Sequence, residues 1–180
     1  MKQFVKLTVA PLAALIFLAA CGNNNPVTKE QDSTSQHETI ATSPAIVQLK
    51  DDKLHAVYQH YVLLSAALVK GDVKAARLAG NAIETGASEI TGGEAIGAGA
   101  AKITATADIA TQRIAFSALS NDFISLAKKS GLSSGQLYVD FCPMAMNDKG
   151  AYWLSSDKAI RNPYFGDQML TCGEVKETIQ

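Results

Sequence analysis

The sequence predicts a mainly α protein, an antiparallel bundle of three or four helices that carries a small β or irregular cap at its C-terminal end. Two observations lead to this class. Apolar residues recur at spacings of three and four between about residues 54 and 126, as helices with one buried face require. After Gly135 the composition changes, and half of all aromatic residues fall between residues 138 and 165.

The first 20 residues are expected to be a lipoprotein signal peptide that is removed from the mature chain. Lys2 and Lys6 precede an apolar run over residues 7–20, which is shorter than the roughly 20 residues that a membrane-spanning helix needs. Small residues precede Cys21 directly, and this pattern resembles the bacterial lipobox, in which the cysteine thiol is diacylated. Cys21 is therefore the predicted lipidation site and the contact with the membrane.

Two further segments complete the domain organisation. Residues 21–45 hold almost no large apolar side chains, so they are expected to form a flexible tether behind the lipidated cysteine. Residues 46–180 are long enough to form one domain with a real core. From Cys21 onward the chain has 14 basic and 17 acidic residues, a net charge of −3, with no basic stripe. A nucleic-acid partner is therefore not expected.

Three helical segments follow from the apolar spacing. The first is interrupted at Gly71, and Asp72 is a good N-cap for the second, whose stripe of small residues lets helices approach closely. In the third, Lys128 and Lys129 complement the helix dipole and Gly131 can cap the end. The positions that define the three stripes are Leu54, Val57, Tyr58, Tyr61, Leu64 and Leu68; Val73, Ala76, Gly80, Ile83 and Ala87; and Ile109, Phe116, Leu119, Phe123 and Leu126.

The glycine-rich stretch over residues 86–99 is expected to be a flexible loop between helices. It is not expected to hold a phosphate group, because no strand precedes it and no Gly-Lys-Ser/Thr sequence follows.

The cap is expected to begin with a strand over residues 137–142. Leu137, Val139 and Phe141 alternate there with Tyr138, Asp140 and Cys142, as in a half-buried strand. Residues 147–150 have turn chemistry, residues 151–154 are expected to form the returning strand, and residues 162–167 a rigid irregular loop.

Soft sulfur is concentrated in this cap. Every methionine after the initiator and both cysteines after Cys21 lie here, and thiolate and thioether together prefer Cu(I) or Ag(I) over hard cations. An extended segment would place alternate residues on one face, and one helical turn would bring together residues three apart. The predicted metal ligands are Cys142, Met144 and Cys172, with Met146 and Met169 as auxiliary ligands.

Several motifs of the cap resemble a domain-of-unknown-function family found in envelope lipoproteins and at the end of some periplasmic copper/silver efflux adaptor subunits. The resemblance covers roughly residues 50 to 179. Its motifs are Cys142-Pro143-Met144-Ala145, Gly150-Ala151-Tyr152-Trp153-Leu154-Ser155, Ile160, Asn162-Pro163-Tyr164-Phe165-Gly166-Asp167, and Met169-Leu170 through Cys172-Gly173.

This resemblance implies a helical domain of the cell envelope that binds copper or silver and passes it to a heavy-metal efflux system. The partner would be an efflux adaptor or another envelope protein. The expected location is the periplasm-facing side of the envelope, at the outer membrane in preference to the inner one. The Cys-Pro-Met core is also similar to the metal-binding motif Cys-Pro-Met-His-Pro, but Ala145 stands in place of the histidine, so sulfur would carry the binding.

Two other interpretations stay open. Cys142 and Cys172 could form a disulfide, because the envelope is oxidising and the closed loop would contribute about 3.5 kcal/mol in the chain-entropy model. The protein would then be a metal-free structural or interaction lipoprotein, which could dock through the aromatic loop around Tyr164. An enzyme is not expected, because the three histidines lie far upstream of Cys142 and no base is paired with a nucleophile in sequence.

Overall fold

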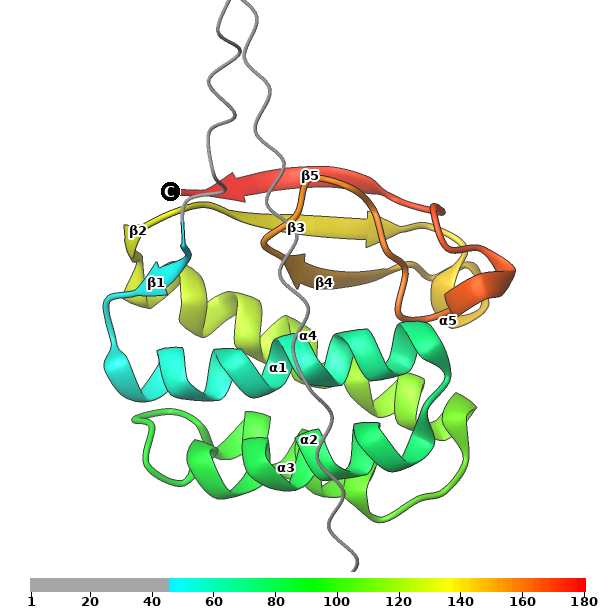
Figure 1. Cartoon of the computed structure of the whole chain (residues 1–180), viewed down its shortest axis with the longest axis horizontal. Coiled ribbons are helices and arrows are strands. Elements are labelled where there is room, and N and C mark those ends of the chain that lie inside the picture. Colours follow the sequence, from blue (N-terminus) through cyan, green and yellow to red (C-terminus); the bar gives the residue numbers. More distant parts are fainter. Residues whose placement is uncertain (1–45) are drawn as a thin grey trace, which may run out of the picture. The chain divides into compact units, whose positions relative to one another are not determined.

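The computed structural model describes residues 46–180 (Figure 1). The predicted signal peptide, the lipidation site Cys21 and the tether lie outside the described residues. No helix within the described range is long and apolar enough to cross a bilayer. The four long helices are α1 (Asp52–Lys70), α2 (Val73–Ala87), α3 (Glu94–Thr104) and α4 (Ile109–Ser130).

Each of these helices packs against the next one in the chain, and α1 also contacts α4. The α1 and α4 helices lie between the C-terminal strands and the α2 and α3 helices (Figure 1). The large side chains buried between the elements include Tyr61, Leu64 and Leu68 from α1 and Phe116, Leu119 and Phe123 from α4. This arrangement confirms the predicted mainly α class, with four long helices packed together within residues 46–180.

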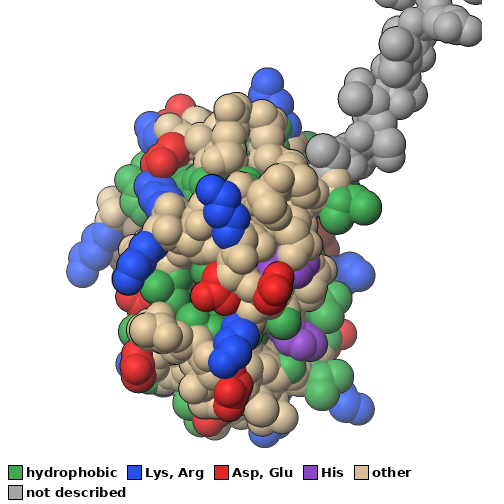
Figure 2. Space-filling view, turned by 90° about the vertical axis from the view of Figure 1, so that its left-hand side faces the viewer, with side chains coloured by type: hydrophobic (Ala, Val, Ile, Leu, Met, Phe, Trp, Pro, Cys, Tyr) green, Lys and Arg blue, Asp and Glu red, His purple; other side chains and the backbone are tan. Residues whose placement is uncertain are grey.

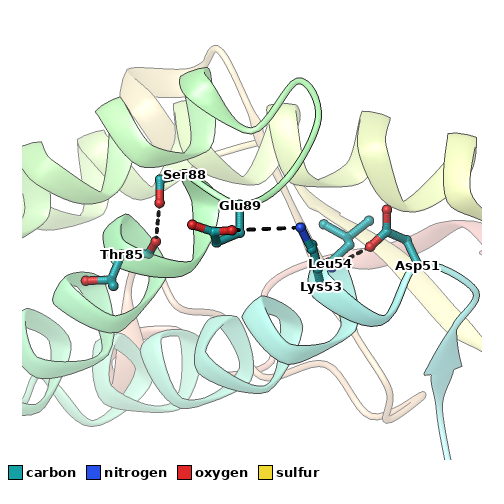
Figure 3. Close-up of polar contacts among 6 residues, drawn as sticks. All are labelled: Asp51, Lys53, Leu54, Thr85, Ser88 and Glu89. Carbon is teal, nitrogen blue, oxygen red and sulfur yellow. Dashed lines mark hydrogen bonds and ion pairs between the residues drawn. The ribbon is translucent and has the colours of Figure 1, made fainter.

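Aspartate side chains define where three of the helices begin. Asp51 and Asp72 accept hydrogen bonds from the backbone N–H groups three residues later, and Asp108 does the same for α4. These bonds satisfy N–H groups that the first turn of a helix leaves without partners. Figure 3 shows the Asp51 cap beside the ion pair between Lys53 and Glu89, which joins the start of α1 to the end of α2 across 3.8 Å.

The glycine-rich stretch differs from the prediction, because α3 already begins at Glu94 and contains Gly97 and Gly99. The loop between α2 and α3 therefore comprises only residues 88–93. A Cβ atom at Gly99 would lie 3.0 Å from Cβ of Leu119 in α4, so glycine at this position permits the close approach of the two helices. The prediction of a flexible loop was wrong because it treated glycine as a helix breaker and overlooked its value in helix packing.

The cap contains two small antiparallel sheets. One pairs β1 (Gln48–Leu49) with β2 (Leu132–Ser134). The other has the strand order β4-β3-β5, with β3 (Leu137–Cys142) in the centre, β4 (Ala151–Ser155) on one side and β5 (Glu174–Ile179) on the other. The short helix α5 (Ala145–Asp148) lies between β3 and β4, and the 3₁₀ helix η1 (Gly166–Gln168) precedes β5. The predicted turn at residues 147–150 and the returning strand are both present.

Strand β3 differs from the predicted half-buried pattern. Asp140 and Cys142, which the alternation placed outward, are fully buried, whereas Phe141 is half-buried. The reason is that the outward face of β3 is covered by the chain that follows β4. Tyr164 belongs to this covering segment. Its ring contacts the ring of Trp153, the cross-strand partner of Asp140, and the two ring centroids are 5.9 Å apart.

Two tyrosine hydroxyl groups close the free edge of β4. Tyr61 on α1 accepts a hydrogen bond from the backbone N–H of Leu154 at 3.0 Å and also bonds the Ser120 hydroxyl on α4 at 2.8 Å. The Tyr164 hydroxyl donates to the backbone carbonyl of Tyr152. An exposed strand edge invites pairing with another chain, so these bonds both satisfy the edge and fasten the cap to the helices.

Candidate metal centre

The two cysteines of the cap meet although 30 residues separate them in the chain. Cys142 ends β3, Cys172 lies in the turn before β5, and their Sγ atoms are 2.7 Å apart. Neither is bonded to another cysteine among the described residues. Cys142 is completely buried and Cys172 is partly exposed. One sulfur atom therefore faces the interior and the other lies at the boundary with solvent.

The strand ladder and one glycine position these two sulfur atoms. Cys142 pairs with Ala151 in the same regular register that pairs Asp140 with Trp153, so Cys142 lies on the covered face of the sheet. Gly173 has a φ of 141°, and a Cβ atom there would lie 2.9 Å from the Trp153 ring. The glycine after Cys172 thus lets the returning chain lie directly against the sheet.

Asn162 fixes the loop that carries Cys172. Its side-chain amide is fully buried and donates to the Cys172 carbonyl at 2.8 Å. The amide oxygen accepts hydrogen bonds from the backbone N–H groups of Tyr164 and Phe165. The backbone N–H of Asn162 donates to the Leu170 carbonyl at 2.8 Å. Sequence reasoning placed this asparagine in a rigid loop and assigned it no role, although an Asn-Pro pair is a signal for side chain to backbone bonding.

The three methionines of the cap lie in two different parts of it. Met169 follows η1, and its carbonyl accepts a hydrogen bond from the Cys172 N–H at 3.0 Å. The two residues therefore share a turn, but the predicted helical turn is wrong, because Met169 has an extended φ of −148°.

The other two methionines lie where the chain has left the strand. Extension stops at Cys142 and the chain turns at Pro143, so the predicted shared face of Cys142 and Met144 was wrong. Met144 is 48% exposed, and Met146 has a left-handed backbone with φ 55°. Both line an open hollow of about 630 Å³ that also contacts Ile114 and Phe165 and is not lined by either cysteine.

The charges around the thiol pair are few. The neighbouring Cys142 thiol raises the pKa of Cys172 to about 11, because the hydrogen bond between the sulfur atoms retains its proton. Asp140, two residues before Cys142, is fully buried, and neither carboxylate oxygen has a hydrogen-bond partner among the described residues. Burial raises the pKa of Asp140 to about 7, and the charge of Asp157 adds to this effect.

No group of three or more His, Cys, Asp or Glu side chains in the described part of the chain is arranged to hold a metal ion. His55 lies on α1, where its Nδ1 accepts a hydrogen bond from the Leu49 N–H. His60 lines a groove between α1 and α2. Figure 2 shows one face of the molecule, on which basic and acidic side chains are interspersed.

Fold and site together define a helical-bundle protein whose C-terminal cap brings two thiols into contact. Residues 57–135 match the model of a protein family described as a protein of unknown function (DUF3347). The match runs from α1 to the residue after β2, so the three-stranded sheet and both cysteines lie beyond it. No curated protein and no solved structure matches the chain.

Proposed function

We propose that this protein is an envelope lipoprotein that binds a soft monovalent metal ion, Cu(I) or Ag(I), as an accessory to heavy-metal efflux or copper homeostasis. The observation that carries the proposal is the contact between Cys142 and Cys172, whose sulfur atoms converge at 2.7 Å from two distant stretches of chain. Thiolates are the protein ligands that Cu(I) prefers, and the neighbouring methionines supply further soft donors.

The donor set fits such an ion after a small movement. Two thiolates that each lie about 2.3 Å from one ion, as in zinc sites, are roughly 3.8 Å apart in tetrahedral geometry. The two sulfur atoms must therefore separate by about 1 Å when an ion enters. Cys172 is the residue able to move, because its side chain is partly exposed while Cys142 is enclosed by the sheet.

The methionines divide into two groups in this proposal. Met169 shares the turn of Cys172 and is the first choice for a third ligand. Met144 and Met146 line the adjacent hollow and are auxiliary donors on its open side. An ion held by the enclosed Cys142 thiolate, the partly exposed Cys172 thiolate and one thioether would stay accessible from the side of Cys172, which suits transfer by ligand exchange.

The cellular setting of the proposal comes from the sequence. A lipid on Cys21 would hold the domain at the periplasmic side of a membrane, the outer one in preference to the inner one. The partner would be a heavy-metal efflux adaptor or another envelope protein that accepts the ion. The protein acts here as a binding protein and not as an enzyme.

The test is a titration of the reduced full chain in detergent with Cu(I), against a competing chelator and after the thiols have been counted. One tightly bound ion is expected, and the Cys142→Ser, Cys172→Ser double variant should bind about 100-fold or more weakly. Thr171→Ser changes an exposed neighbour of Cys172 and serves as the matched control. Absence of competition by the reduced protein, or equal binding by the double variant, would remove the proposal.

A second candidate function is that of a metal-free interaction lipoprotein whose cap is held by a Cys142–Cys172 disulfide. The same contact favours it, because 2.7 Å is closer to the 2.05 Å of a disulfide bond than to the separation across a metal ion. A thiol count on protein purified without reductant tests this candidate: two free cap thiols would contradict it.

A further inference from the structure

We infer that Cys142 and Cys172 form a thiol–disulfide switch, in which the dithiol holds the soft metal ion and the disulfide excludes it. The inference rests on the proposed function, since it assigns a regulation to the same site. It also makes the two candidate functions two states of one protein.

Both states of the switch use the same two sulfur atoms. The sulfur atoms are 2.7 Å apart, so a covalent bond requires a further approach of only about 0.7 Å. A metal ion requires the opposite movement, a separation by about 1 Å. A sulfur atom in a disulfide has no thiolate charge to offer a metal ion, so the two states exclude each other.

The two thiols differ in how accessible they are to a molecule from solvent. Cys142 is completely buried beneath the loop that covers the sheet, whereas Cys172 is partly exposed in the turn before β5. An incoming disulfide or thiol can therefore reach the Cys172 sulfur and not the Cys142 sulfur. The reaction therefore has a defined order, because thiol–disulfide exchange depends on access to the reacting sulfur atoms.

The chemistry of oxidation follows this order. The Cys172 thiol first gives up its proton to water, and its thiolate attacks the disulfide of an oxidant such as oxidised glutathione, forms a mixed disulfide and releases one glutathione thiolate. The Cys142 thiolate then attacks the Cys172 sulfur and releases the second glutathione thiolate. The two cysteine thiols lose two protons and two electrons, and two molecules of reduced glutathione gain them.

Hydrogen bonds within the loop hold the backbone of Cys172 in place during the exchange. The buried Asn162 amide binds the Cys172 carbonyl, and the Cys172 N–H binds the Met169 carbonyl. Gly173 keeps the following residue against the sheet. A mixed disulfide at Cys172 would therefore stay next to the Cys142 sulfur, which favours closure of the internal bond over capture of a second glutathione.

The experiment compares the two states of the full chain in detergent. The protein is reduced, the reductant is removed without oxygen, and one half is treated with oxidised glutathione. In the oxidised half, peptide mapping is expected to find the Cys142 and Cys172 peptides joined by a disulfide, with a combined mass lower by two hydrogen atoms. Ag(I) is the probe, and its affinity for the oxidised form should be lower by about tenfold or more and recover after renewed reduction.

The possible failures are distinguishable. If the reduced protein binds Ag(I) and no internal disulfide forms, or if the oxidised protein binds equally well, the switch is wrong and the proposed function stands. If the reduced protein does not bind Ag(I), the proposed function and the switch both fall, whether or not the disulfide forms.

The order of reaction has its own test in two single variants. The Cys142→Ser chain should take up one glutathione at Cys172, and the Cys172→Ser chain should react at Cys142 about tenfold or more slowly. Peptide mapping assigns each modified cysteine, so that Cys21 is not counted. Equal rates for the two variants would overturn the proposed order.

Discussion

Asp140 is a buried carboxyl group with no hydrogen-bond partner in the described part of the chain, and such a group favours its neutral form. Its pKa is about 7 in the folded protein, compared with about 4 in an unfolded chain. Between these pH values the folded state binds more protons than the unfolded state. The contribution of Asp140 to the free energy of unfolding therefore falls as the pH rises from about 4 to about 7, and this loss is complete above pH 7.

Asp140→Asn is expected to remove this pH dependence. At pH 8 the variant should unfold with a higher free energy than the wild type, by up to about 4 kcal/mol. The advantage should be about 2–3 kcal/mol smaller at pH 5, because the wild-type carboxyl is then protonated in the folded state. Urea unfolding at both pH values measures the difference. An advantage of the same size at pH 5 and pH 8 would show that Asp140 is ionised in the folded protein.

The residue scale is also where the sequence alone was least informative. The alternation of residues 137–142 correctly predicted a strand, but the burial of Asp140 depends on a loop that returns from 20 residues further along. Asn162 binds five backbone groups in that same loop. Such contacts depend on the path of the whole chain, and no local pattern contains them.

At the scale of elements, the Tyr61 hydroxyl joins α1 to the edge of β4. Tyr61→Phe keeps the ring in the core and leaves the buried Leu154 N–H and the Ser120 hydroxyl without this partner. The free energy of unfolding should fall by about 1–3 kcal/mol. Tyr138→Phe is the matched control, because the Tyr138 hydroxyl is exposed and bonds only the Gln136 side chain. Chemical denaturation of both variants makes the comparison, and equal losses would contradict the role of Tyr61.

The contact between α3 and α4 gives a second prediction at this scale. Gly99→Ala should lower the free energy of unfolding by about 1–2 kcal/mol, because the added Cβ atom would lie 3.0 Å from Leu119. Gly97→Ala is the control on the same helix, since its Cβ atom would make only an ordinary contact of 3.5 Å with Ala87. It should raise stability by up to about 1 kcal/mol. Thermal unfolding of the Gly99→Ala and Gly97→Ala variants measures the two effects. The same change in stability at both positions would mean that Gly99 has no packing role.

Most elements could be predicted from local patterns, and the errors have physical reasons. Apolar spacing located the helices because a helix with one buried face repeats every 3.6 residues. Gly71, Asp72 and Gly131 marked helix boundaries as predicted. The α3 helix was missed because its glycines serve packing between helices. The predicted strand over residues 137–142 has the observed bounds, but Cys142 and Met144 do not share an extended face, because the chain turns at Pro143 and has left-handed backbone at Met146.

At the scale of the whole molecule, the central feature is the meeting of two thiols from opposite ends of the cap. Composition identified Cys142 and Cys172 as candidates, but their separation of 2.7 Å depends on the path of β3, the loop fixed by Asn162 and the turn before β5. The sequence could not divide the methionines into one beside Cys172 and two beside the open hollow. That division requires the three-dimensional arrangement of α5 and η1.

The proposed role of Met169 follows from this arrangement. Met169→Leu should weaken Cu(I) binding by about tenfold, whereas Met144→Leu should have a smaller effect. Both substitutions preserve side-chain volume, so the two variants control for each other. Competition titration of the reduced chains measures the difference. A larger loss in Met144→Leu would place the metal ion on the side of the hollow.

X-ray absorption at the copper edge of the Cu(I)-loaded, reduced full chain tests the proposed sulfur site most directly. The expected result is a first coordination shell of sulfur atoms alone, lost in the Cys142→Ser, Cys172→Ser double variant. A first shell of nitrogen or oxygen donors, or a sulfur shell that survives in the double variant, would contradict binding by the two cap thiols.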